Sequence, residues 1–184
     1  VRSDHTSGRF ADLGPGLLGR VIDGLGQPID GKGPIPIHTR RPLASPGVEP
    51  LARETIATPF PTGVRVIDSM TTLGRGQRIG IFSRPGVGKS TLLATLARHA
   101  ASEINVIALI GERGREVQEF IQHALGPKGL ARSVVVAATS EESPLLRVRA
   151  SLLATAIAEY FRDGGERGRD VLLAMDSLTR VAQA

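Results

Sequence analysis

Residues 80–91 read Gly80-Ile81-Phe82-Ser83-Arg84-Pro85-Gly86-Val87-Gly88-Lys89-Ser90-Thr91. An apolar run precedes the glycines and a helical pattern follows them, which is the setting that a phosphate-binding loop requires. Gly86 and Gly88 permit backbone angles that turn successive N–H groups toward one anion, and the helix N-terminus adds its dipole. Lys89 can bridge the β- and γ-phosphates, and the Ser90 hydroxyl can bind Mg²⁺. The stretch therefore predicts a P-loop that binds ATP and Mg²⁺.

We expect the whole loop to contact the nucleotide. The predicted nucleotide-binding residues are Ser83, Arg84, Pro85, Gly86, Val87, Gly88, Lys89, Ser90 and Thr91. Ser83 departs from the usual pattern, which has glycine five residues before the second glycine. The alternative is an ordinary glycine-rich turn between a strand and a helix, but both the context and the spacing favour the P-loop.

The chain from about residue 62 alternates apolar runs with amphipathic segments, which predicts parallel strands joined by crossover helices. We expect strands at Arg78 to Phe82, Asn105 to Ile110, Ser133 to Ala138 and Val171 to Met175. We expect helices at Thr91 to Ala101, at Glu116 to Leu125 with Gly126 as terminator, and from a cap at Ser143 to a stop at Gly164-Gly165. The predicted fold class is α/β with a mostly parallel sheet.

The N-terminal third has a different character. Residues 1–32 contain one short apolar stretch and turn signals, and we interpret them as the end of a small β-barrel. Residues 34–61 hold seven of the twelve prolines, which predicts an irregular linker over residues 33–61 that lies against the core. Residues 62–184 are the predicted nucleotide-binding core.

Two further strands end in carboxylates. Glu112 follows the second strand in Gly111-Glu112-Arg113-Gly114, and Asp176 ends the fourth strand as in a Walker B element. Because the carboxyl ends of parallel strands share one edge, both should lie beside Lys89. Glu112 could then activate the attacking water, and Asp176 could join Ser90 in holding Mg²⁺. The alternatives are helix caps or solvated charges. We also include Arg113 among the candidate catalytic residues.

Composition narrows the class of protein. The chain carries 23 Lys+Arg against 18 Asp+Glu and no cysteine, which fits a reducing compartment and excludes a cysteine metal site. Its apolar runs are too short to cross a bilayer. Aromatic residues are only 3%, so the stacking surfaces of single-strand binders are scarce and we expect no nucleic acid. The four histidines share no metal-binding spacing.

These motifs together resemble the flagellar and type III secretion export ATPases, which are related to the catalytic subunits of rotary ATP synthases. The matching stretches are residues 16–26, 62–68, 74–82, 86–91, 111–117, 157–163 and 175–180. The resemblance implies a RecA-like core in a homohexamer that hydrolyses ATP. In that family the residues matching Lys89, Glu112 and Asp176 are the phosphate clamp, the catalytic carboxylate and the acid on the metal side.

The resemblance also implies a cytoplasmic protein, peripheral to the inner membrane, that drives protein export. Its expected partners are a stalk protein, a stator-like regulatory protein, chaperone-bound export substrates and the membrane export gate. In the family fold, a strand between the P-loop strand and the Walker B strand comes after the position of Ala184, as does the arginine finger. We therefore expect these 184 residues alone to hydrolyse ATP poorly.

Three other interpretations fit the same core. One is a nucleotide-binding subunit of a rotary ATPase, including a non-catalytic subunit, against which Glu112 argues. Another is a hexameric RNA helicase-like motor, which needs a base-stacking module. A remnant that binds partners without turnover is a third possibility.

Overall fold

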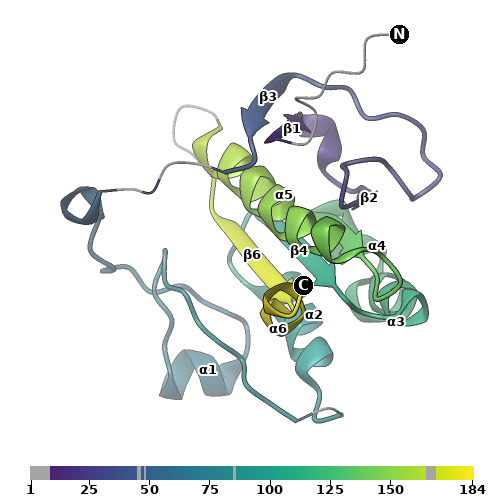
Figure 1. The fold of residues 1–184 in the computed structure, drawn as a ribbon. Coiled ribbons are helices and arrows are strands. Elements are labelled where there is room, and N and C mark those ends of the chain that lie inside the picture. The colour runs from purple at the N-terminus through teal and green to yellow at the C-terminus, as the bar shows by residue number, and fades with distance from the viewer. Residues whose placement is uncertain (1–8, 45–46, 48, 85, 165–168) are drawn as a thin grey trace, which may run out of the picture.

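The computed structural model describes residues 9–44, 47, 49–84, 86–164 and 169–184, and its centre is a parallel four-stranded sheet (Figure 1). The strand order is β2 (Val21–Asp23), β5 (Ser133–Ala138), β4 (Ile104–Ile110) and β6 (Val171–Asp176). Three of these strands match the sequence predictions to within a residue at each end. The predicted α/β class with a parallel sheet is confirmed.

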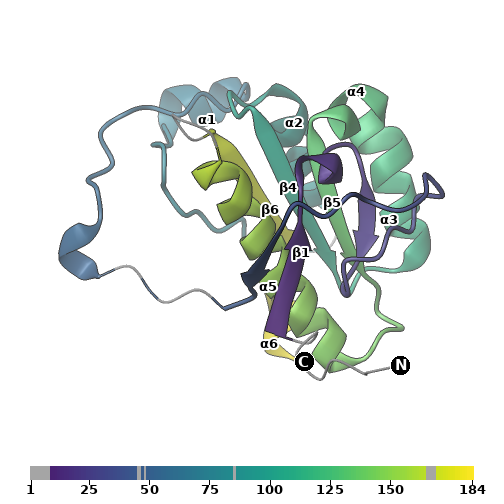
Figure 2. The same cartoon turned by 90° about the horizontal axis from the view of Figure 1, so that it is seen from above.

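Strand β4 organises the core because it pairs with β5 on one side and β6 on the other. All seven of its residues are buried, and successive side chains point to opposite faces. Val106, Ala108 and Ile110 pack with α5 (Pro144–Asp163). Ile107 and Leu109 pack on the other face with α2 (Lys89–His99) and α3 (Gly114–Glu119). Figure 2 shows the sheet between these two helical layers.

The three predicted helices are present, and the described residues form three further short ones: α1 (Arg65–Met70), α4 (Gly126–Ala131) and α6 (Leu178–Ala182). Helix α5 is capped by the Ser143 hydroxyl, which accepts a hydrogen bond from the Leu146 N–H. Helix α3 continues into a π-helical segment, η4 (Phe120–Leu125), and then into α4 (Gly126–Ala131). Gly126, with a φ of +67°, is the C-terminal cap residue of the π-helical segment as expected, but α4 begins at the same residue with Pro127 in its first turn. Gly165 lies outside the described residues.

Strand β2 corrects one sequence prediction. Residues 21–23 were expected in a barrel remnant, but β2 pairs in parallel with β5 and forms an edge of the core sheet. Ile22 is fully buried among the side chains that pack on α5, so this strand belongs to the core by its contacts. The neighbouring strands β1 (Phe10–Leu13) and β3 (Thr39–Pro42) form a separate antiparallel pair. The barrel itself, and the domain boundaries at 32 and 61, stay predictions.

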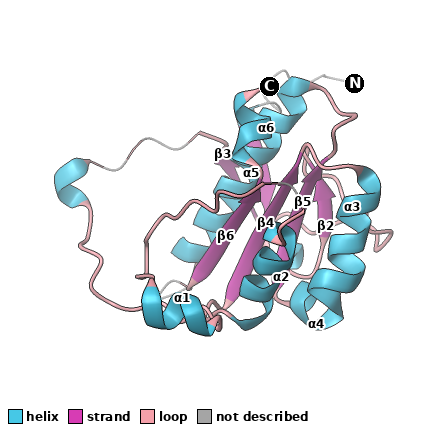
Figure 3. Ribbon diagram, turned by 90° about the horizontal axis from the view of Figure 1, so that it is seen from below, coloured by secondary structure: helices cyan, strands magenta, loops and turns pink. Residues whose placement is uncertain are grey.

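The second half of the proline-rich segment leaves the core, whereas Ile35 and Leu43 in its first half pack against it as expected. Residues 49–59 are all exposed, including a short 3₁₀ turn, η3 (Pro50–Ala52), and the chain returns to the body near α1 (Arg65–Met70). Figure 3 shows this arm projecting from the helical layers. With the carboxylate of Asp68 accepting hydrogen bonds from Thr62 and Gly63, the arm is fixed where it rejoins the body.

The predicted strand at residues 78–82 is not a strand in the structure. These residues are irregular, and Ile79 and Phe82 are exposed. A strand exists only through its hydrogen-bonded neighbours, and β6 is the edge of the described sheet on this side. A cavity of about 330 Å³ separates β6 from residues 79–83. Residues 78–82 thus lie beside the sheet but apart from β6. The family resemblance implies one further strand in the space between residues 78–82 and β6.

Among the residues that the structure describes, no helix combines the length and the apolar character needed to cross a bilayer.

The assignment of β2 to the core can be tested by stability. Replacing Ile22 by Ala should lower the free energy of unfolding by about 2–5 kcal/mol, because the side chain is fully buried. Leu25→Ala in the loop that follows β2 is the control, with an expected change within about 0.5 kcal/mol because Leu25 is 55% exposed. Urea denaturation of the two variants measures both. An Ile22→Ala change no larger than the control would remove β2 from the core.

Candidate nucleotide-binding site

The site forms where three elements meet at the carboxyl edge of the sheet. The N–H of Gly111, directly after β4, donates to Ala138 O of β5 at 2.7 Å. The N–H of Ser177, directly after β6, donates to Ile110 O at 3.3 Å. Helix α2 begins at the same edge, with Gly88 as its N-terminal cap residue. The ends of β4 and β6 are therefore held together beside the start of the P-loop helix.

Lys89 and Asp176 form an ion pair across this junction. The Lys89 ammonium contacts the Asp176 carboxylate, although the two residues are 87 positions apart in the chain. The side chain of Asp176 is 4% exposed and that of Lys89 is 32% exposed. Asp176 does not cap the next helix, α6 (Leu178–Ala182), whose cap position is Ser177. The capping alternative for Asp176 is thus not what the structure shows.

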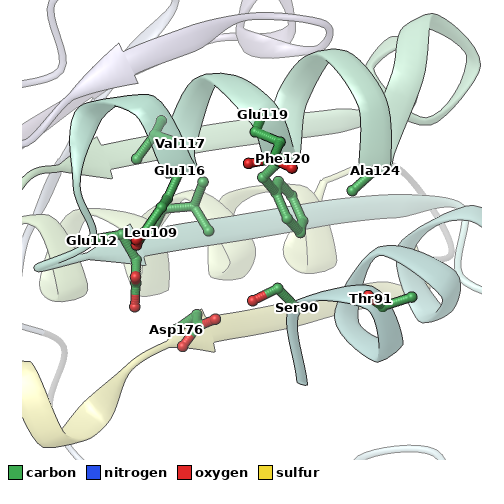
Figure 4. Close-up of a pocket in the computed structure, with 10 residues that line it drawn as sticks. All are labelled: Ser90, Thr91, Leu109, Glu112, Glu116, Val117, Glu119, Phe120, Ala124 and Asp176. Atoms are coloured by element: carbon green, nitrogen blue, oxygen red, sulfur yellow. The ribbon is translucent and has the colours of Figure 1, made fainter. Parts of the chain in front are cut away.

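Ser90, Glu112 and Asp176 surround one cavity of about 240 Å³ (Figure 4). The Ser90 hydroxyl and the Asp176 carboxylate point toward the same space, and the Glu112 carboxylate reaches it from the end of β4. Apolar side chains close the far end, namely Leu109, Val117, Phe120 and Ala124. The cavity therefore has a polar mouth beside the P-loop and an apolar interior.

A larger cavity of about 740 Å³ adjoins the first and follows the P-loop. Of the predicted loop residues, the structure places these on its wall: Ser83, Arg84, Gly86, Gly88, Lys89, Ser90 and Thr91. Gly86 and Gly88 have φ values of +80° and +96°, which the left-handed region allows to glycine at little cost. Val87 is exposed and is not among the lining residues, and Pro85 lies outside the described residues.

Glu112 has an altered acidity. Its pKa rises from the ordinary 4.5 to about 7, first because the carboxyl is partly buried. A hydrogen bond with Glu116 and the negative charge of Asp176 raise this pKa further, while Lys89 lowers it. The same hydrogen bond lowers the pKa of Glu116, which is the partner that carries the negative charge. A carboxyl whose pKa lies near neutral pH is suited to exchange a proton.

Arg113 is not brought to the site. Its side chain is exposed, and its guanidinium lies 3.8 Å from the Glu116 carboxylate one helical turn ahead. It lines neither cavity. Such an exposed pair contributes little to stability, and the position gives Arg113 no contact with the other candidate residues.

Several lining residues were missed from the sequence, among them the charged residues Glu116 and Arg180. Glu116 lines both cavities, and Arg180 of α6 lines the larger one. Arg180 packs over Gly111, where an added Cβ would lie 2.7 Å from the Cβ and Cγ of the arginine, and Gly111 has a φ of +75°. The sequence signals were the four-residue spacing from Glu112 to Glu116 and from Asp176 to Arg180. Glu116 and Arg180 lie in the first turn of α3 and of α6, the helices that follow these two carboxylates, so both remain close to the strand ends.

The donor set fits a magnesium ion. Ser90 and Asp176 offer a hydroxyl and a nearly buried carboxylate, which are hard oxygen ligands. Among the described residues, no group of three or more His, Cys, Asp or Glu side chains could hold a metal by itself. Mg²⁺ is usually bound through one or two protein ligands together with substrate phosphates and water.

A glycine-bearing loop and a helix N-terminus at the carboxyl edge of a parallel sheet define a RecA-like nucleotide-binding core. The sequence profile of the ATP synthase alpha/beta family, nucleotide-binding domain, matches residues 63–184. The chain therefore belongs to the ATP synthase alpha/beta family.

Relatives and solved structures agree with this assignment. A type 3 secretion system ATPase of Xanthomonas euvesicatoria is 58% identical, and a flagellum-specific ATP synthase of Treponema pallidum is 55% identical, each over 172 residues. Each match covers 94% of this chain and 38% of the relative. The assembled ATPase EscN of enteropathogenic E. coli, in complex with its central stalk EscO, is similar with a TM-score of 0.88 and 48% identity. That match covers 95% of this chain and 42% of EscN.

The raised pKa of Glu112 predicts a pH-dependent stability. Folding favours the protonated form, so the contribution of Glu112 is full below pH 4.5 and is lost as the pH rises through about 7. Relative to Glu112→Gln, which cannot titrate, the wild-type protein should lose stability across this interval and stay level above about pH 8. Urea denaturation in EDTA at a series of pH values measures the difference. A difference that is constant with pH would contradict the raised pKa.

Proposed function

We propose that this chain is the catalytic core of an ATPase that energises protein export through a type III secretion or flagellar apparatus. The observation that carries the proposal is the convergence of Lys89, Ser90, Glu112 and Asp176 on adjoining cavities at one sheet edge. The relatives with the names type 3 secretion system ATPase and flagellum-specific ATP synthase support the export function.

Each of these residues has a separate role in phosphoanhydride cleavage. Lys89 and the N–H groups of the loop bind the phosphates, whose charge they neutralise. Ser90 and Asp176 hold Mg²⁺, which when bound supplies Lewis-acid stabilisation of the phosphoryl oxygens. Glu112, at the end of the rigid strand β4, orients the attacking water and accepts its proton. Its partner Glu116 is positioned to share that proton through their hydrogen bond.

The assembly that we propose is a homohexamer in which a neighbouring subunit completes each nucleotide site. Phe82 and Leu178 are exposed at 95% and 63% around the cavity beside β6, and Val87 of the P-loop is 65% exposed. Exposed apolar groups gathered in one region are typical of surfaces that further protein covers. The EscN structure, an assembled ATPase with its central stalk, supports this arrangement.

The remaining partners follow from the same family resemblance. We propose a cytoplasmic location peripheral to the inner membrane, and contacts with a stalk protein and a stator-like regulatory protein. Chaperone-bound export substrates and the membrane export gate complete the proposed set. Both secretion and flagellar proteins occur among the similar relatives, so the proposal covers both systems.

The catalytic role of Glu112 is tested by its replacement with Gln in the intact protein. Turnover of Mg-ATP should fall by about 10²–10⁴-fold, the usual contribution of a general base, while nucleotide binding is retained. Glu103→Gln is the matched control, because Glu103 is an exposed glutamate at the opposite end of β4. Steady-state phosphate release and nucleotide titration measure the two effects. Full activity of the Gln variant would favour a non-catalytic nucleotide-binding subunit.

A further inference from the structure

The two groups that a Mg-nucleotide needs most are bound to each other. Lys89 is the first residue of α2 and Asp176 is the last residue of β6, and their side chains form an ion pair. Lys89 is the residue that binds phosphate in the proposed function, and Asp176 is the one that binds the metal. Neither can take up its role fully while it remains the partner of the other.

We propose that Asp176 is an internal competitor of phosphate for Lys89, so that the Lys89–Asp176 pair opposes nucleotide without Mg²⁺ and yields to nucleotide with Mg²⁺. This inference rests on the proposed function, because it concerns the same site. It adds a regulatory property: the site discriminates between free ATP and Mg-ATP through an exchange of ion-pair partners within the chain.

Burial couples the two partners. Asp176 is 4% exposed, so its carboxylate loses much of its charge compensation when Lys89 leaves it. Removing one partner of a buried pair leaves an uncompensated charge, which is strongly unfavourable. A phosphate that draws Lys89 away leaves that charge and brings further negative charge beside it. A divalent cation at Asp176 restores the balance, since it neutralises the carboxylate that Lys89 has left.

Further acidic side chains lie close to the Lys89–Asp176 pair. Glu112 and Glu116 line the same cavities, and the Glu112 carboxyl group interacts electrostatically with both members of the pair. Arg84 and Arg180 line the larger cavity as the cations other than Lys89. The effect of Asp176 on nucleotide affinity that acts through Lys89 must therefore be separated from the electrostatic effect of all these charges on the nucleotide. Thermodynamic linkage supplies the method, because a coupling between two groups appears as non-additivity of their variants.

The test is a double-mutant cycle on ATP binding in the intact protein, measured by calorimetry in excess EDTA. Asp176→Asn keeps the shape of the side chain and removes its charge, and it should raise the affinity for Mg²⁺-free ATP by about tenfold. In the Lys89→Met background the same substitution should give little gain, because no lysine is left to be released. Glu112→Gln, which removes a carboxyl group of the same cavity that is not paired with Lys89, should give a clearly smaller gain than Asp176→Asn.

Two results would overturn the inference. One is an equal gain from Asp176→Asn with and without Lys89, which shows a general field effect. The other is no gain, or a loss, in the presence of Lys89. The first measurement is a titration of the wild-type protein with Mg-ATP. If it shows no binding, the proposed function fails, and this failure is thereby distinguished from the two results above.

A second measurement needs no variant. Acylation of lysines by a neutral reagent in EDTA, followed by mass spectrometry, reports the reactivity of Lys89 against Lys128, an exposed lysine of α4. The ion pair predicts at least a severalfold slower reaction at Lys89. Equal rates at the two lysines would show that Asp176 does not hold the amine.

Discussion

The parallel pairing of β4 with both of its neighbours is the constraint on which the site depends. Because the register joins Ile110 to Ala138 and Leu109 to Asp176, the three strands end at nearly the same level. Every group placed just after a strand then faces the same edge. Residues from distant parts of the chain become neighbours without any long-range polar contact having to guide them there. The apolar strands thus determine where the charged groups lie.

Much of this arrangement could be predicted from the sequence because the apolar signals are strong. Unbroken runs of Val, Ile and Ala predicted β4 and β5, and the proline after Ser143 marked the start of α5. The placement of Glu112 and Asp176 followed from the shared edge of parallel strands. Their roles in hydrolysis are proposals.

The differences have physical causes that local sequence cannot express. Residues 78–82 have the composition of a strand, but composition does not supply the neighbour that a strand pairs with. Ile22 could equally fill a barrel or the core, because an apolar run does not indicate which sheet it joins. Glu116 and Arg180 were missed because they lie in the first turns of the helices that follow the strands, where ordinary surface charges are also common. Arg113 is the opposite case, a residue that was predicted in the site and lies outside it. Its neighbour Glu112 lies in the site, but its own side chain is exposed to solvent.

The complete burial of β4 has a consequence for motion. Backbone hydrogen bonds on both sides and apolar layers above and below leave this strand no local route to opening, so it can loosen only when the domain as a whole unfolds. Glu112, placed at its end, is accordingly a fixed reference point. Opening and closing around a ligand must come from the P-loop, whose described residues other than Lys89 are exposed, and from the short helix α6. The site thus combines one immobile wall with two adjustable ones.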